Sequence, residues 1–315
     1  KTITALAASR RLYDEKNRLE VVIAVPYQHL VDQWREEAAM FGYKPILAYQ
    51  NKSSWLERLN HDIIDFNGGY RSFIAVITTH DTFISADFQA SIARLQEPIL
   101  LIADEAHHLG AERSRQNYPQ HIPYRLALSA TPDRWFDDEG SAALRAYFGE
   151  TVFSFTLEQA IGVSLTPYYY YPHLVSLSDD EMVDYEALSL KIARLMNQED
   201  VEKQAALKML LIKRANLLNT AVNKLEKLSE LLDREPYLEH TLFYCAPGQI
   251  NEVLQLVGWE KGILINQFTA EENPKERQQL LSSFANGELQ ALAAMKCLDE
   301  GVDVPSTRTA YFLAS

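Results

Sequence analysis

Short apolar runs alternate with longer amphipathic stretches over the first half of the chain. The runs predict strands, and the stretches, in which apolar residues recur every three or four positions, predict helices. The predicted strands are 20–25, 45–48, 73–78, 99–103 and 124–129, and the predicted helices include 3–12, 29–41, 55–65 and 87–94. Because strands separated by helices pair in parallel through right-handed crossovers, we predict an α/β fold with a doubly wound parallel sheet.

The second half begins with a helical region and then returns to this alternation. Residues 179–232 carry a stripe at three- and four-residue steps, which predicts a helical face turned toward a core. The stripe consists of Leu207, Leu210, Leu211, Arg214, Leu217, Leu218, Ala221, Leu225 and Leu228. Further strands and helices are predicted at 241–245, 249–257, 262–266, 274–284, 290–295 and 309–313. Since 315 residues exceed the usual size of one core, we predict domains at 1–160 and 237–315, joined by a helical linker or insert at 161–236.

Composition limits the classes of protein that fit this pattern. The net charge of −13 argues against a protein that coats polyanions, although it permits a nucleic-acid motor with a local basic track. The two cysteines, Cys245 and Cys297, provide neither a disulfide framework nor a zinc cluster. No apolar run reaches the ~18 residues that span a bilayer, and no signal-peptide pattern opens the chain, so we expect a cytoplasmic protein.

Two adjacent carboxylates follow the most apolar predicted strand. Asp104 and Glu105 come directly after residues 99–103, where the strand reaches the carboxyl edge of its sheet. An Mg²⁺ ion on a triphosphate needs a hard oxygen ligand, which suits Asp104, and an attacking water needs a base, which suits Glu105. The alternative is that the pair only caps the next helix.

Two further segments extend this hypothesis. Lys1 and Thr2 open a predicted helix and fit the end of a phosphate-binding loop, in which the Lys ammonium contacts phosphates and the Thr hydroxyl binds Mg²⁺. The alternative is an ordinary Lys-Thr pair. Ser129 and Thr131 follow the strand after the carboxylates, where their hydroxyls are a candidate coupling element, or simply part of a turn that ends at Pro132.

In their order along the chain, these segments resemble the motifs of the superfamily 2 helicases. The matching segments are 1–2, 25–34, 78–80, 104–107, 129–131, 242–246 and 297–305, similar to motifs I, Ia, Ib, II, III, IV and V. Motif II is D-E-A-H, and the second half resembles the DEAD/DEAH-box branch, which includes restriction-enzyme motor subunits, repair translocases and phage-defence helicases. The glycines of motif I and the arginine-rich motif VI are absent from the sequence, so we expect a fragment.

The resemblance implies two RecA-like domains, the second truncated, that use ATP and Mg²⁺. It implies that Lys1 and the carboxylates Asp104 and Glu105 are catalytic, and that His107 couples the sites together with the two hydroxyl residues. In the second domain it implies nucleotide contacts from Gly301 and Asp303.

The resemblance also implies a nucleic-acid track along loops that offer hydroxyl, amide and helix N-terminal donors. The candidate contacts are Pro26, Tyr27, Gln28, Thr78, Thr79, Thr269 and Lys296. For Trp34 we expect an indole that packs on the sheet rather than a base-stacking platform. We predict DNA as the substrate, with nuclease or other defence or repair subunits as partners. The alternatives are an RNA helicase with the same core and a non-motor nucleotide-binding scaffold.

Overall fold

The computed structural model describes residues 1–134, 137–196, 201–235, 237–269, 272–295, 304 and 306–314, without the side chains of residues 201, 202 and 274. The chain divides into two compact units, Lys1–Pro167 and Tyr168–Ser315. The helical region that we predicted as a separate linker or insert falls largely within the second unit.

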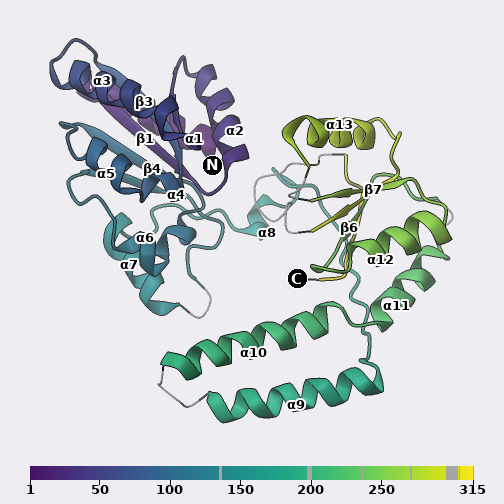
Figure 1. Ribbon diagram of the computed structural model, residues 1–315. Coiled ribbons are helices and arrows are strands. Elements are labelled where there is room, and N and C mark those ends of the chain that lie inside the picture. The colour runs from purple at the N-terminus through teal and green to yellow at the C-terminus, as the bar shows by residue number, and fades with distance from the viewer. Residues whose placement is uncertain are drawn as a thin grey trace. The chain divides into compact units, whose positions relative to one another are not determined.

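The first unit contains a five-stranded parallel sheet in the order β2-β3-β1-β4-β5 (Figure 1). The strands are β1 Leu19–Val25, β2 Ile46–Ala48, β3 Phe73–Thr79, β4 Ile99–Ala103 and β5 Tyr124–Ala127. The predicted doubly wound sheet is therefore confirmed. The last strand ends two residues before the predicted bound, so Ser129 lies in a turn rather than in a strand.

Helices cover both faces of this sheet. The helices of this unit are α1 Thr2–Lys16, α2 Gln28–Met40, α3 Leu56–Asn67, α4 His80–Phe83, α5 Ala86–Ile92, α6 Glu112–Arg115, α7 Asp138–Phe148 and α8 Leu157–Ala160, with short 3₁₀ turns η1 Lys52–Ser54 and η2 Ala106–Gly110. Of these, α6 packs on α7 and η2, and among the described residues neither α6 nor α8 contributes to the two core clusters of the sheet. In β1, Val22 and Ala24 join a core cluster with α3 and α5, whereas Val21 and Ile23 join a second cluster with α1 and α2. Burial on both faces explains why the strands are continuous apolar runs.

The second unit contains a four-stranded parallel sheet in the order β7-β8-β6-β9. Its strands are β6 Thr241–Tyr244, β7 Ile265–Phe268, β8 Ala291–Ala294 and β9 Thr309–Phe312. The helices that pack near it are α11 Asn223–Leu232, α12 Ile250–Leu254, the π-helical turn η3 Gln255–Glu260 and α13 Pro274–Ala285. The second predicted α/β region is thus confirmed as a parallel sheet with helices.

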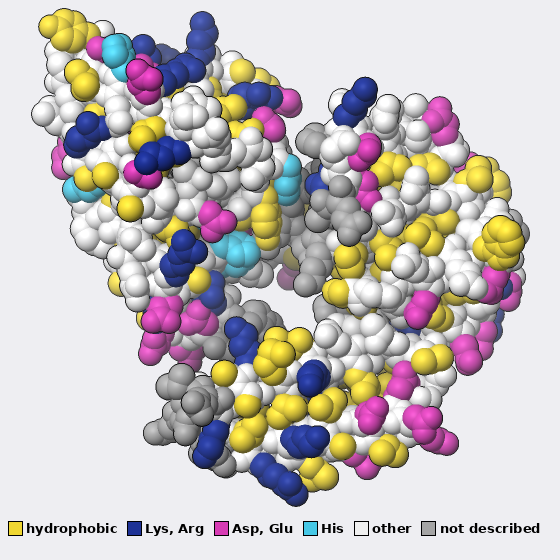
Figure 2. Space-filling model, viewed as in Figure 1, with side chains coloured by type: hydrophobic (Ala, Val, Ile, Leu, Met, Phe, Trp, Pro, Cys, Tyr) yellow, Lys and Arg dark blue, Asp and Glu magenta, His cyan; other side chains and the backbone are white. Residues whose placement is uncertain are grey.

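The leucine stripe of the helical region is only partly a core face. It lies on α10 Val201–Asn219, which packs along α9 Asp179–Leu195, and on α11. Leu228 of α11 is buried as predicted, but none of the described side chains of α10 is buried, and apolar side chains are exposed over this helix pair (Figure 2). The prediction is wrong for α10 because a single neighbouring helix can cover only part of its surface. Among the helices described, none is both long and apolar enough to cross a membrane.

Candidate nucleotide-binding site

The strand register brings the predicted site segments to one edge of the first sheet. Ala24 pairs with Ala103, and Ala103 pairs with Ala127, so the residues that follow β1, β4 and β5 emerge side by side. Val25 pairs with Thr79 in the same way, which places the end of β3 at this edge. Ligands of open parallel sheets bind outside the carboxyl ends of their strands.

Backbone geometry separates the two carboxylates of the Asp-Glu pair. Asp104 continues the strand, since its N–H donates to the carbonyl of Ala24 at 2.8 Å, and its side chain is buried. Glu105 takes the left-handed conformation at φ 41°, and its N–H donates to Asp104 Oδ1 at 3.0 Å. The next residue, Ala106, returns to the sheet edge with its N–H on the carbonyl of Leu128 at 2.9 Å. Because of this turn, neighbouring carboxylates lie in different surroundings, as two different roles require.

The amino end of α1 reaches the same edge. Lys1 Nζ lies 2.7 Å from Glu105 Oε1, and the two side chains are 42% and 20% exposed. Thr2, the first residue of α1, is half-buried beside it. The segments that we predicted to share a triphosphate are therefore in direct contact within the first unit.

The predicted coupling residues are also in contact. His107 Nδ1 lies 3.0 Å from Ser129 Oγ and 3.5 Å from Glu105 Oε2. The backbone N–H of Thr131 donates to Ser129 Oγ at 3.1 Å, while the Thr131 side chain is exposed. A chain of short polar contacts thus joins the turn after β5 to Glu105.

Burial and neighbouring groups act in opposite directions on the Asp104 carboxyl. Burial raises the pKa of this carboxyl above the usual value, whereas the hydrogen bond from Trp34 and the charge of Lys1 oppose this rise. The Asp104 carboxylate lies at this edge, and Thr2, which carries a hydroxyl, begins the adjoining α1. Hard oxygens of these two kinds are the ligands that Mg²⁺ prefers. The residues present therefore fit the metal that helicase chemistry uses.

Two buried rings at this edge belong to the segments 25–34 and 78–80 that resemble motifs Ia and Ib. Trp34 of α2 donates its indole N–H to Asp104 Oδ2 at 2.9 Å. His80 is buried beside His108, with ring centroids 6.2 Å apart, and burial together with His108 lowers the pKa of His80 to about 3, so its ring is neutral. The apolar spacing of α2 correctly predicted that Trp34 is buried, but no local pattern indicates its carboxylate partner.

The predicted nucleic-acid contacts of the first unit differ in accessibility. Tyr27 is 42% exposed at the N-cap of α2, next to the half-buried Pro26 and the exposed Gln28. Thr79 accepts the N–H of Thr82 and so caps α4. Thr78 is fully buried, and its hydroxyl donates to the carbonyl of Ala48 at 2.7 Å. We therefore correct the prediction for Thr78, because a buried hydroxyl that is already used inside the sheet cannot reach a phosphate.

In the second unit the structure also argues against Thr269. This residue is 4% exposed, and both its N–H and its hydroxyl bond the Glu272 carboxylate, at 2.6 Å and 3.0 Å. Its side chain stabilises the turn before α13 instead of facing a ligand. Lys296, Gly301 and Asp303 lie outside the described residues, so their roles stay predictions.

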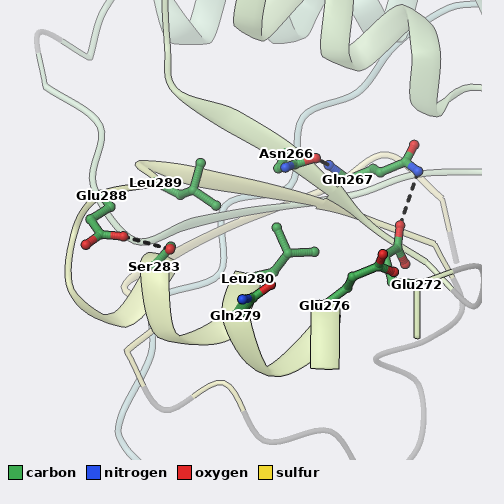
Figure 3. Close-up of a pocket in the computed structure, with 9 residues that line it drawn as sticks. All are labelled: Asn266, Gln267, Glu272, Glu276, Gln279, Leu280, Ser283, Glu288 and Leu289. Carbon is green, nitrogen blue, oxygen red and sulfur yellow. Dashed lines mark hydrogen bonds between the residues drawn. The ribbon is translucent and has the colours of Figure 1, made fainter. Parts of the chain in front are cut away.

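A pocket of about 550 Å³ lies between α13 and β7 in the second unit (Figure 3). Three glutamates line it, and among its lining residues there is no Lys or Arg. Gln267 Nε2 donates to Glu272 at 3.1 Å, and Ser283 Oγ donates to Glu288 at 2.7 Å. An acidic lining repels phosphate, so this pocket is not a candidate for the triphosphate.

Comparisons with known proteins agree with this geometry. Residues 1–134 match the family described as the res subunit of type III restriction enzymes. The DNA 3'-5' translocase XPB2 of Sulfurisphaera tokodaii is 31% identical over 284 residues, which cover 83% of this chain and 62% of that protein. The chain is similar to helicases of superfamily 2. The predicted resemblance is thereby confirmed.

Other proteins to which the chain is similar are more distant. A putative DNA 3'-5' helicase, Rad25 of Halobacterium salinarum, is 24% identical over 324 residues, which cover 98% of this chain and 44% of that protein. A solved structure of S. cerevisiae Dbp5 bound to RNA and ADP BeF3 has a TM-score of 0.50 and 13% identity, covering 94% of this chain and 62% of that one. At this identity the likeness shows the fold alone. The chain spans less than two thirds of the length of these curated relatives.

Proposed function

We propose that this chain is the motor core of an ATP-dependent DNA translocase or helicase. The observation that carries the proposal is the contact of Lys1 Nζ with Glu105 Oε1 at 2.7 Å, beside the buried Asp104. Relatives named as DNA 3'-5' translocase and helicases support DNA as the substrate.

The chemistry follows from the roles that these side chains can fill. An incoming triphosphate competes with Glu105 for the Lys1 ammonium, and when Lys1 turns to the phosphates it frees Glu105 Oε1. The freed carboxylate then accepts the proton of the attacking water. Asp104 and Thr2 would hold Mg²⁺, which when bound neutralises charge on the phosphates.

Coupling to nucleic acid would use the same sheet edge. Tyr27 and Gln28 lie at the amino end of α2, where helix N–H groups and exposed side chains suit a phosphate backbone. His107 and Ser129 connect Glu105 to the turn after β5, so a change in that turn would alter the position of the base. Lys296, Gly301 and Asp303 are proposed to complete the nucleic-acid and nucleotide contacts from the second unit.

The match to a res subunit supports a protein that works with other subunits, and a nuclease is the partner we propose.

Nucleic-acid-stimulated ATPase activity tests the function. We expect the full-length protein to hydrolyse ATP faster with single-stranded or duplex DNA than with RNA. Glu105→Gln should retain ATP binding, measured by calorimetry, and lose stimulated hydrolysis by about 10²–10⁴-fold, the usual contribution of a general base. Stimulation by RNA alone would overturn the choice of DNA. ATP binding with no hydrolysis under any condition would instead favour the scaffold.

A further inference from the structure

Two tryptophans are buried in the first unit, on opposite faces of its sheet. Trp34 is 1% exposed in the cluster with α1 and α2, and Trp55 is 4% exposed in the cluster with α3 and α5. The Trp34 indole N–H donates to Asp104 Oδ2 at 2.9 Å. Within the part of the chain that the structure describes, the Trp55 indole N–H has no hydrogen-bond partner. The two side chains are therefore alike in burial and differ in what their N–H groups do.

The hydrogen bonds on Asp104 fix the plane of its carboxylate. Oδ1 accepts the N–H of Glu105 at 3.0 Å, and Oδ2 accepts the N–H of Trp34 at 2.9 Å. Each oxygen has two lone pairs, so one bond to each oxygen leaves acceptor capacity for a cation while it removes rotation about the terminal torsion. A charged acceptor also strengthens both bonds.

The donor itself is held in place by packing. Trp34 lies in one apolar cluster with Leu30, Val31 and Ala38 of α2 and with residues of β1. An indole side chain has only two torsions, and close packing fixes both of them. The position of the Trp34 N–H is therefore fixed as well. The orientation of the Asp104 carboxylate thus depends on a side chain that is packed in the core of the sheet, and not on exposed residues at its edge.

We propose that Trp34 is the positioning residue of Asp104, whose indole N–H orients the carboxylate toward the divalent cation that accompanies the nucleotide. The inference rests on the proposed function, since it takes Asp104 as a metal ligand. Donors that orient metal ligands in this way typically contribute about 10–100-fold to metal affinity or activity.

The test compares Trp34→Phe with Trp55→Phe, which removes a similarly buried indole whose N–H has no hydrogen-bond partner among the described residues. We would measure Mn²⁺ affinity by electron paramagnetic resonance in the full-length protein with a non-hydrolysable ATP analogue, and the Mg²⁺ concentration for half-maximal ATPase activity. We expect Trp34→Phe to weaken Mn²⁺ binding by about 10-fold or more and to raise the Mg²⁺ requirement by a similar factor. Trp55→Phe should leave both within about twofold, since the indole that it removes donates to no metal ligand.

A second variant removes the N–H without changing shape. Incorporation of benzothienylalanine at position 34 replaces the N–H by sulfur, so it keeps the packing if Trp34→Phe destabilises the fold. It should reproduce the metal defect with an unchanged melting temperature. Equal metal affinity in the wild type, the benzothienylalanine protein and Trp55→Phe would overturn the role of Trp34. Failure of the wild type itself to bind nucleotide and Mn²⁺ would instead overturn the proposed function.

Discussion

The two ends of the first sheet both contain buried carboxyl groups, but their surroundings differ. At the carboxyl end, Asp104 accepts hydrogen bonds on both oxygens and lies near the Lys1 ammonium. At the amino end, Glu20 of β1 is fully buried, and neither of its oxygens has a hydrogen-bond partner among the described residues. Its charged neighbours are Asp62 of α3 and Arg71, which pair with each other at 3.2 Å.

Burial raises the pKa of both carboxyl groups, and the neighbouring groups that oppose this rise differ between them. Burial and the charge of Asp62 raise the pKa of Glu20 well above its usual value, and Arg71 opposes this rise only in part. For Asp104, burial and the charge of Glu105 also raise the pKa, and the hydrogen bonds from Trp34 and the Glu105 N–H together with the charge of Lys1 oppose part of this rise. The pKa of both carboxyl groups is therefore raised, but only Asp104 has hydrogen-bond donors and a nearby ammonium that stabilise its charged form.

The largest expected difference between the two ends is in catalysis. Asp104→Asn removes a charge from the proposed metal site and should lower DNA-stimulated ATPase activity by at least about 100-fold. Asp62→Asn is the matched control, because both aspartates are buried and only one faces the nucleotide edge. It should change turnover by less than about twofold, since the charge that it removes touches no nucleotide-binding residue. A comparable loss of activity in both variants, with both folded by circular dichroism, would contradict the functional division of the sheet.

The second largest expected effect is on the free energy of unfolding, which we expect Glu20→Gln to change in a pH-dependent way. A group whose pKa is raised on folding stabilises the fold below its ordinary pKa, near 4.5, and this contribution is lost as the pH rises through its raised value. The amide introduced by this substitution cannot ionise, so the variant should gain stability relative to the wild type as the pH rises from 4.5 to 8. We expect a difference of about 1–3 kcal/mol in the free energy of unfolding at the upper end.

Urea denaturation at several pH values measures this difference. Glu36→Gln, at an exposed position of α2, is the control and should show no such divergence. Parallel curves for the wild type and Glu20→Gln over this range would mean that Glu20 is not neutral in the folded chain.

The smallest expected effect is that of a substitution at Ser129, which lies at the carboxyl end of the first sheet. Ser129→Ala removes the hydroxyl between His107 and the Thr131 N–H, and leaves the metal and phosphate ligands intact. We expect a loss of roughly 1 kcal/mol of coupling, which is about a fivefold lower DNA-stimulated rate with unchanged unstimulated turnover. Steady-state assays with and without DNA separate the two rates, and an equal decrease in both would assign Ser129 to the chemistry instead of the coupling.

Strand patterns predicted the first sheet well because its strands are buried on both faces. β4 has the predicted bounds, since a continuous apolar run cannot be accommodated at the surface. Helices α4, α6 and α8, each four residues long, were not predicted, because one turn is too short to display a helical period. The α10 stripe has the expected spacing, but α10 packs along α9 and none of its described side chains is buried.

Some features of the candidate site were also predictable from the sequence, and others were not. The sequence by itself determined that Asp104 and Glu105 end a buried strand and that other strand ends meet them, because parallel pairing is imposed by the alternation of strands and helices. The hydrogen-bond partners of the buried polar side chains depend on the tertiary structure and could not be predicted from the sequence. Trp34 lies 70 positions from Asp104, and Trp55 and Glu20 are as deeply buried without any partner among the described residues. Hydrophobicity determines that such side chains are inside, but contacts between distant segments determine whether a buried donor meets an acceptor.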